Sequence, residues 1–189
     1  MRFHGALRFR QDSGGWRRYL ALVAAVAGDD EEVAGVHCSW LDPVHPVLAP
    51  VSRPRKAPGR IHGLAVRFGE PIKVNTLLVG DGIETVLSLV TVRQHGALRT
   101  TVPSGTFAAA ALSAGSLGAF VPPSHIARLI IAQDRDKAGG LAARRLQLRC
   151  TRLGIASAVL LPAGNDFNDD LRSFGPEPLA TRLAPLVPT

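Results

Sequence analysis

The stretch that decides the fold is LLVGDGIETVLS, residues 77–88. Its apolar start is typical of a buried strand over residues 75–79, and the glycine-flanked Asp81 then interrupts the apolar run. From Ile83, apolar residues recur at helical spacing as far as His95. The stretch therefore predicts a strand that turns directly into a helix, with an acidic side chain in the turn.

The rest of the C-terminal region repeats this alternation of strand and helix. We expect strands at 98–102, 128–132 and 157–161, helices at 107–117 (with Thr106 as N-cap) and 138–153, and short helices near Asn168 and Pro178. Such alternation indicates right-handed βαβ units and a parallel sheet covered by helices on both faces. The predicted fold class is therefore α/β, and ligands of such sheets bind at the carboxyl ends of the strands.

The N-terminal region predicts a small β-rich extension. Residues 1–18 are basic and are expected to be irregular, whereas segments 20–27 and 33–41 flank a charged turn and predict a β-hairpin. Prolines recur from Pro43 to Pro58, so that stretch predicts a loop. We expect the extension to cover residues 1–70 and the α/β domain to cover residues 71–189.

Both tryptophans are candidates for nucleic-acid contact. Trp16 and Trp40 could stack on unpaired bases, as aromatic side chains do in single-strand binders. Core packing is the alternative, and it is the one we expect, because Trp40 falls within a predicted strand.

The acidic residues are few and are gathered at the predicted strand ends. Residues 71–189 carry eight, and seven of them fall in three clusters, namely Asp81/Glu84, Asp134/Asp136 and DFNDD at 166–170. If strand geometry persists to residue 136, Asp134 and Asp136 project to the same side. Carboxylates so placed can hold Mg²⁺ or Mn²⁺. Helix capping by Asp81 and Glu84, and a turn with an Asp cap at residues 134–136, are the structural alternatives.

The overall charge favours a polyanionic partner. The formal net charge is +7 over 189 residues, without a dominant basic run, so an Arg-rich protein with no such partner remains the alternative. Arg53, Arg55 and Lys56 lie in the proline-rich loop and could contact phosphates, or could simply be solvated. The two cysteines show no metal-site spacing or disulfide pattern, and the expected compartment is the reducing cytoplasm, without a membrane span.

Three segments in this order carry a family resemblance: residues 77–88, residues 130–139 (IIAQDRDKAG) and residues 166–169 (DFND). Together they resemble the Toprim domain of primases and primase-helicases of phages, plasmids and mobile elements. The resemblance covers roughly residues 72–175 and implies a Toprim-like sheet. Segments 21–41 and 56–68 are similar, less specifically, to the region that often precedes this type of Toprim domain.

The resemblance also implies roles for individual residues. Asp81 would be the general acid or base, with Glu84 as a further catalytic member, and Asp81, Asp134 and Asp136 would bind Mg²⁺ or Mn²⁺. Asp166, Asn168 and Asp169 would complete the site, while Arg135 and Lys137 would contact nucleic acid. The family usually has Glu where this chain has Asp81.

The function implied is Mg²⁺-dependent nucleotidyl transfer by a DNA primase, with single-stranded DNA and nucleotides as partners. A helicase or an upstream primase module on another chain would be a further partner. The alternatives are a non-catalytic nucleic-acid-binding remnant or accessory module of a primase-helicase, and a Toprim nuclease. The only tyrosine, Tyr19, lies outside the Toprim-like segment, which argues against a topoisomerase.

Overall fold

The computed structural model describes residues 1–29, 32–69, 75–95 and 107–186. The chain divides into two compact units, Met1–Ile61 and His62–Thr189. The boundary expected between residues 70 and 71 falls outside the described residues. No helix in the described part of the chain is both long and apolar enough to cross a bilayer.

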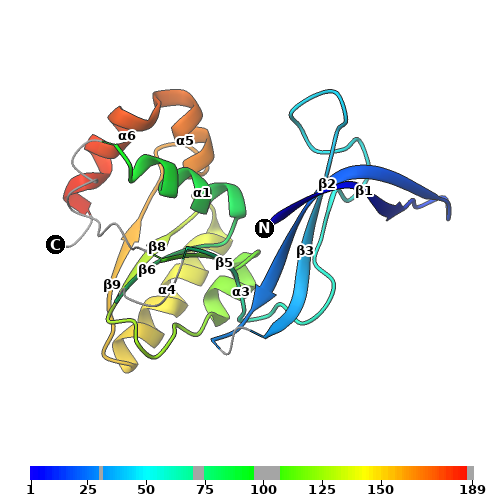
Figure 1. Ribbon diagram of the computed structural model, residues 1–189. Coiled ribbons are helices and arrows are strands. Elements are labelled where there is room, and N and C mark those ends of the chain that lie inside the picture. The colour runs from blue at the N-terminus through cyan, green and yellow to red at the C-terminus, as the bar shows by residue number, and fades with distance from the viewer. Residues whose placement is uncertain (30–31, 70–74, 96–106, 187–189) are drawn as a thin grey trace. The chain divides into compact units, whose positions relative to one another are not determined.

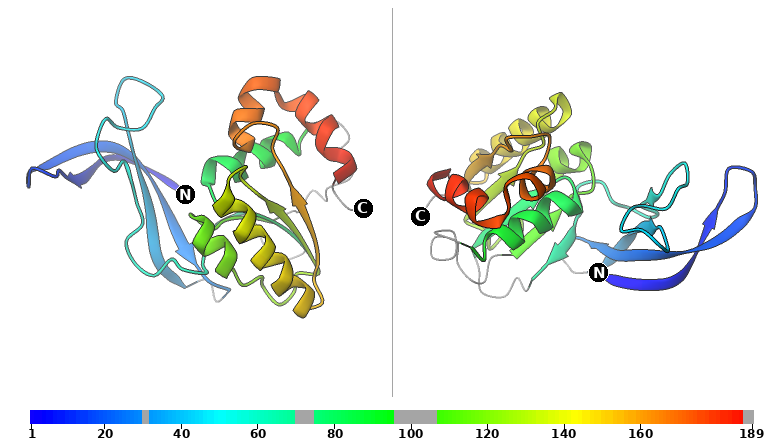
Figure 2. Two further views of the ribbon diagram at one scale, coloured as in Figure 1. Left: turned by 180° about the vertical axis from the view of Figure 1, so that it is seen from behind. Right: turned by 90° about the horizontal axis from the view of Figure 1, so that it is seen from above.

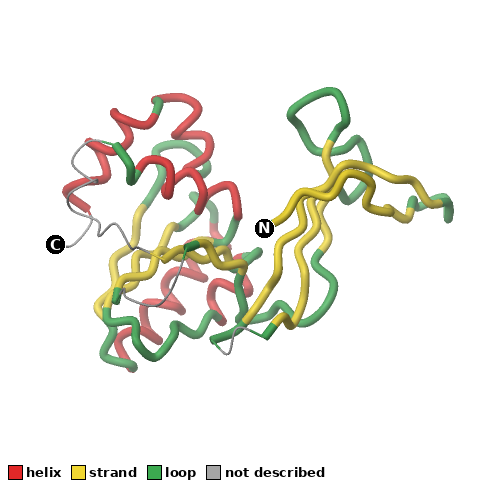
Figure 3. Tube along the Cα trace, viewed as in Figure 1, coloured by secondary structure: helices red, strands yellow, loops and turns green. Residues whose placement is uncertain are grey.

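The first unit is built on a four-stranded antiparallel sheet in the order β1-β2-β3-β4. Its strands are β1 (Arg2–Arg10), β2 (Trp16–Ala27), β3 (Val33–Leu41) and β4 (Arg55–Lys56). The predicted hairpin is confirmed, since β2 and β3 pair from Leu20–Leu41 to Ala27–Val33. In Figure 3 the strands of this unit are drawn in yellow, and the long loop between β3 and β4 is drawn in green.

The prediction that residues 1–18 are irregular was wrong. β1 alternates between a side chain that is buried, Phe9, and neighbours that are exposed, Arg8 and Arg10. Phe9 packs edge-on against Tyr19 and Trp40, at ring-centroid distances of 6.1 and 5.1 Å. The strand therefore has a buried face, which its high content of arginine obscures in the sequence.

The second unit is an α/β sandwich around a five-stranded sheet in the order β5-β7-β6-β8-β9. Its strands are β5 (Val66–Phe68), β6 (Thr76–Gly80), β7 (Phe107–Ala110), β8 (Arg128–Ala132) and β9 (Ala156–Leu160). β7, β6, β8 and β9 are mutually parallel, which confirms the predicted parallel sheet, and β5 is an antiparallel edge strand.

Helices cover both faces of this sheet, as Figures 1 and 2 show. On one face lie α1 (Ile83–Val92), α5 (Phe167–Phe174) and α6 (Pro176–Leu183), and on the other lie α3 (Ala114–Ala119) and α4 (Lys137–Arg152). A short 3₁₀ turn, Ala184–Leu186, follows α6. Alternate side chains of β6 and β8 form the core beneath α3 and α4, with Leu77, Val79, Leu129 and Ile131 packed against Leu146 of α4.

The helix predicted at residues 107–117 was wrong. Residues 107–110 instead form β7, between β5 and β6, and α3 begins only at Ala114 after its N-cap Ser113. Alanine favours helices intrinsically. Here, however, Ala108, Ala109 and Ala110 are buried within the sheet, and their small side chains let the covering helices pack closely on it. The strand expected at 98–102 and the N-cap expected at Thr106 lie outside the described residues.

The α4 interface provides a test of the fold. Leu146 is 0% exposed and Leu148, on the same helix, is 53% exposed. Leu146→Ala should lower the free energy of unfolding by about 2–5 kcal/mol because it leaves a cavity in the core. Leu148→Ala should change it by about 0.5 kcal/mol or less. Urea unfolding of the two variants measures both values, and equal losses would contradict this packing.

Candidate metal centre

Two carboxylates meet at the carboxyl edge of the sheet because of strand register. β6 and β8 are parallel neighbours that end together, with Gly80 opposite Ala132. Asp81 follows the first strand immediately, and Asp134 follows the second strand after one intervening residue. Helices α1 and α4 begin directly after these turns, so both acids are held at their positions by rigid elements.

The two acids interact directly. Burial raises the pKa of the Asp134 carboxyl to about 7, and the neighbouring carboxylates of Asp81 and Asp166 contribute to this rise. A side-chain hydrogen bond between the two carboxyl groups also contributes to the rise. The hydroxyl of Thr85, on the first turn of α1, donates to Oδ1 of Asp134 at 3.3 Å and partly opposes the shift. In the absence of a cation, Asp134 therefore ionises less readily than an ordinary aspartate.

Asp81 is not a helix cap. The N-cap of α1 is Gly82, and no side chain makes a capping hydrogen bond there. Oδ1 of Asp81 is inaccessible to solvent and has no hydrogen-bond partner among the described residues. A buried carboxylate oxygen without a donor, beside a second carboxyl that resists ionisation, is a donor set that a hard divalent cation would complete.

Asp136 lies in a different environment from Asp134. β8 ends at Ala132, and Asp136 is the N-cap of α4, where its Oδ1 accepts a hydrogen bond of 2.6 Å from the Gly139 N–H. The premise that strand geometry continues to residue 136 was therefore wrong. At Gly139 a Cβ atom would lie 2.6 Å from the Asp134 carbonyl oxygen, so this close approach requires glycine.

The third acidic segment begins α5. Asp166 is the N-cap of this helix and its Oδ1 accepts a hydrogen bond of 2.7 Å from the Asp169 N–H. Asn168 and Asp169 follow in the first turn and are half-buried. The charge of Asp166 contributes to the raised pKa of Asp134. Within the described residues, however, no three His, Cys, Asp or Glu side chains form a ready-made ligand set.

The loop that carries Asp166 is held by an ion pair that sequence reasoning missed. Asp170, 1% exposed, accepts hydrogen bonds of 2.7 Å from the N–H groups of both Ala163 and Gly164, and pairs with Arg182 at 2.9 Å. Burial acts to raise the pKa of Asp170, but these hydrogen bonds hold it below its usual value. Asp170 therefore serves the loop backbone, which a sequence pattern of consecutive acids does not reveal.

Two further contacts tie the same loop to its surroundings. Arg182, from α6, also donates to the Leu161 carbonyl at 3.0 Å. Arg135 donates to the Pro162 carbonyl through its Nε at 3.1 Å and also through Nη2, and its backbone N–H donates to the Asn165 carbonyl. We expected Arg135 to contact nucleic acid, but its guanidinium group donates hydrogen bonds within the protein instead.

The other predicted nucleic-acid contacts lie in both units. Lys137, the first residue of α4, is exposed beside the acidic edge. Arg53 and Arg55 are exposed in the first unit, and Arg55 makes an interaction there. Lys56 instead places its ammonium group 4.2 Å from the centre of the Phe9 ring and 5.8 Å from that of Trp40, so it completes an aromatic cluster. Glu84 is exposed in the first turn of α1 and has a partner.

Comparison with protein families gives two matches that together cover most of the chain. A family model described as Toprim domain matches residues 76–177. A second model, described as a domain of unknown function (DUF7146), matches residues 1–68. No curated protein matches the chain.

Comparison with solved structures finds primases. The chain resembles a DNA primase domain from Pseudomonas aeruginosa, with 14% identity and a TM-score of 0.51 over 94% of this chain and 56% of that one. It also resembles the primase fragment of the bacteriophage T7 primase-helicase, with 13% identity and a TM-score of 0.53 over 83% of this chain and 60% of that one. At such identities the likeness establishes the fold, and the chain spans little more than half of each relative.

A third similar structure is that of the bacteriophage T7 lagging-strand DNA polymerase interacting with primase domains bound to an RNA/DNA hybrid and dTTP. Identity is 12% and the TM-score is 0.53, over 91% of this chain and 81% of that one.

The raised pKa of Asp134 makes stability depend on pH. The native Asp134 carboxyl has a pKa of about 7, against an ordinary aspartate pKa of 3.8. Its contribution to the free energy of unfolding is therefore complete below pH 3.8 and is lost as the pH rises through 7. In EDTA, the free energy of unfolding of Asp134→Asn relative to that of the wild type should therefore increase by about 1–2 kcal/mol from pH 5 to pH 8, after allowing for solvent screening. Urea unfolding at the two pH values measures the gain. Asp12→Asn, in the β1–β2 turn, is the control, and parallel curves for all three proteins would contradict the coupling.

The ion pair under the loop gives a second test. Asp170→Ala removes the acceptor of two backbone N–H groups and the partner of Arg182, so it should lower the free energy of unfolding by about 2–4 kcal/mol. Asp169→Ala, one residue earlier, should cost about 0.5 kcal/mol, because Asp169 accepts only a 3.3 Å contact from Asn165. A small loss in both variants would show that the loop does not depend on Asp170.

Proposed function

Because the chain belongs to the Toprim domain family, we propose that it is a primase-like protein that performs Mg²⁺-dependent nucleotidyl transfer on a DNA template during DNA replication. The observation that carries the proposal is the contact between Asp81 and Asp134, in which one carboxyl has a pKa of about 7. These two carboxylates repel each other and have no basic partner among the residues described. A bound cation would neutralise them.

The cation-binding residues that we propose are Asp81, Asp134 and Asp136. The first two supply the facing carboxylates, while Asp136 has only its Oδ1 committed to the helix cap and can offer its second oxygen, directly or through water. Asp166, Asn168 and Asp169 would line the same site from the start of α5. When bound, Mg²⁺ or Mn²⁺ supplies neutralisation of the negative charge on the reacting phosphates.

The chain's own groups have separate tasks in this proposal. Asp134 gives up its proton when the site is loaded, and the Thr85 hydroxyl orients its carboxylate. Asp81 is the acid or base, with Glu84 as a further acidic member on the exposed side of α1. Asp81 is one methylene shorter than the usual Glu, which withdraws the carboxylate by on the order of 1 Å, and such misplacement can lower a rate about 10²-fold.

Single-stranded DNA and nucleotides are the proposed partners. Lys137 is an exposed cation at the start of α4, beside Asp136, and could meet a phosphate there. The T7 primase domains named above were seen with an RNA/DNA hybrid and dTTP, which fits this class of ligand. We also propose a helicase or an upstream primase module on another chain as a partner, because one of the similar structures comes from a primase-helicase.

A non-catalytic nucleic-acid-binding module is the second candidate. The short Asp81 side chain and the commitment of Asp136 to a helix cap both favour a site that holds a cation without turnover. A Toprim nuclease would use the same carboxylates on a phosphodiester, so the products of the reaction distinguish it from a primase.

Metal affinity should follow the ionisation of the acidic pair. Mn²⁺ must displace the proton of Asp134, so its affinity should fall about tenfold for each pH unit below 7. Asp134→Ala should weaken binding because it removes a ligand. Calorimetric titration at pH 6 and pH 8 checks this, with Glu177→Gln as the control, since Glu177 lies at α6 and pairs with His95. Binding that is equal at both pH values and in the Asp134 variant would contradict the site.

Activity should follow the reach of residue 81. Asp81→Asn should abolish Mg²⁺-dependent primer synthesis, whereas Asp81→Glu should raise it by up to about 10²-fold, because the longer side chain restores the usual distance. The assay contains a single-stranded template, nucleotides and any helicase encoded beside this chain. Synthesis that survives Asp81→Asn unchanged would refute the role of Asp81, and cleavage of the template instead of synthesis would favour the nuclease.

A further inference from the structure

The tip of the β1–β2 hairpin carries an exposed group of basic and aromatic side chains. Arg8 pairs with Arg18 across the two strands, and Arg10 pairs with Trp16. Residues directly opposite each other, and those two positions apart, share one face of an antiparallel pair, so these four side chains lie together. All four are exposed, Trp16 to 63%. Packing of Trp16 in a core, which we expected from the sequence, was therefore wrong.

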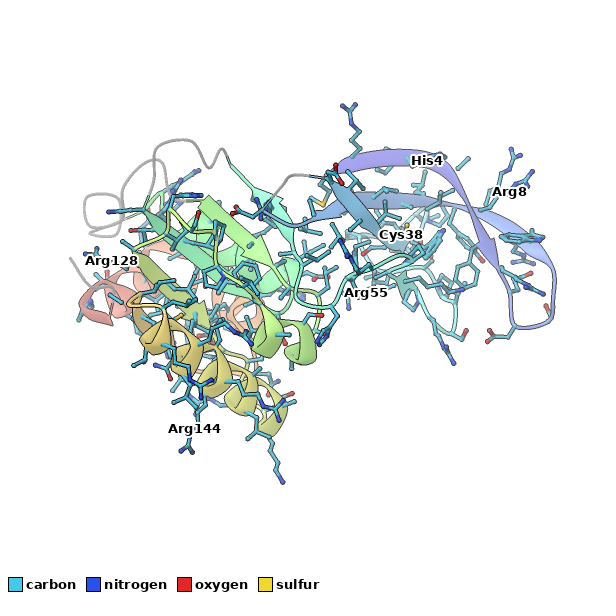
Figure 4. All side chains as sticks on the ribbon, turned by 90° about the horizontal axis from the view of Figure 1, so that it is seen from below. His4, Arg8, Cys38, Arg55, Arg128 and Arg144 are labelled. Atoms are coloured by element: carbon cyan, nitrogen blue, oxygen red, sulfur yellow. The ribbon has the colours of Figure 1, made fainter. Side chains whose placement is uncertain are left out.

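The opposite face of the hairpin packs against the core of the first unit through Phe9. Phe9 lies between Arg8 and Arg10 in sequence, is 2% exposed, and packs on Tyr19, Trp40 and Lys56. This cluster fixes which face of β1 points inward. Arg8, Arg10, Arg18 and Trp16, here called the hairpin patch, consequently point away from the core, and Figure 4 shows Arg8 projecting outward.

The hairpin patch is unfavourable for the isolated fold. Like charges directly opposite on neighbouring strands destabilise the pair, and Arg8 faces Arg18. Among the residues that the structure describes, none of the three guanidinium groups makes a hydrogen bond or an ion pair. Asp12, in the exposed turn, is the nearest acid in sequence, and Arg17, which pairs with Phe9, lies on the other face of the hairpin. A ligand that neutralises the arginines and covers the indole would remove both penalties.

We propose that the hairpin patch binds single-stranded nucleic acid, with a base stacked on Trp16 and the adjoining phosphates on Arg8, Arg10 and Arg18. Guanidinium groups bind phosphate through paired hydrogen bonds, and an exposed indole stacks on any unpaired base. A duplex hides the faces of its bases, so this combination favours a single strand. The patch lies in the unit that matches a domain of unknown function, and it goes beyond the metal-dependent reaction because it needs no cation.

Fluorescence of the full chain tests the proposal in EDTA. Trp40 is 6% exposed, so quenching by a short oligothymidylate should report on Trp16. Trp16→Ala should lower affinity roughly 5- to 150-fold. Trp16→Phe should lose most of the quenching yet bind within about threefold of the wild type, because a phenyl ring still stacks. Arg8→Gln with Arg18→Gln should reduce the slope of log affinity against log salt by about 0.7 for each phosphate that the variant no longer binds.

The matched control is Arg144→Gln with Arg145→Gln, which removes the same charge from the exposed face of α4 in the other unit, where Figure 4 labels Arg144. This variant should bind like the wild type apart from a small general salt effect. Equal reductions of affinity in the two double variants, absence of binding by the wild type, or equal affinity for duplex would overturn the proposal. Binding to anionic vesicles that the single strand fails to displace would also overturn it, in favour of a membrane surface.

The outcome is separable from that of the proposed reaction. Asp134→Ala should leave oligothymidylate binding in EDTA unchanged. A chain that binds the single strand through the hairpin patch but makes no primer would refute the primase proposal alone, whereas primer synthesis that is unaffected by Trp16→Ala, together with unchanged binding, would refute the hairpin site alone.

Discussion

The rest of the candidate site depends on the repulsion between Asp81 and Asp134. Parallel pairing of β6 with β8 brings both strands to the same edge, and the two turns that follow leave the carboxyl groups in contact. Burial first, and then the neighbouring Asp81, raise the pKa of Asp134 to about 7, so ionising both carboxyl groups is unfavourable in the absence of a cation. The fold therefore maintains an arrangement that is unfavourable in itself, as functional sites commonly do.

The surrounding acids hold the backbone around this pair. Asp136 and Asp166 cap α4 and α5, and Asp170 binds two N–H groups of the loop between β9 and α5. Arg135 reaches across to the same loop, at Pro162. The acids at this edge thus fall into two groups. Asp81 and Asp134 form the proposed cation-binding pair, and the other acids accept backbone hydrogen bonds that hold the surrounding loops in position.

Much of this was predictable from local sequence patterns. The run 77–88 predicts β6 and α1 because strand and helix periods are clear on each side of Asp81, and β8 was placed correctly from its apolar run. The segments that were predicted wrongly are those whose structure is determined by tertiary packing. The alanines of β7 adopt a strand because they lie between two other strands, and Phe9 orders a strand that looks like a basic arm. Capping by Asp136 and the ion pair of Asp170 with Arg182 depend on the folded backbone and its neighbours, which single-residue patterns do not contain.

We propose that Asp81 and Asp134 together bind a divalent cation. Anomalous X-ray diffraction from crystals of the chain grown above pH 7 with Mn²⁺ tests it most directly, because the signal locates the metal without reference to activity. We expect a peak between the two carboxylates, with oxygen ligands from both and water completing the coordination. A fully occupied Mn²⁺ site elsewhere, with no anomalous peak between Asp81 and Asp134, would contradict it.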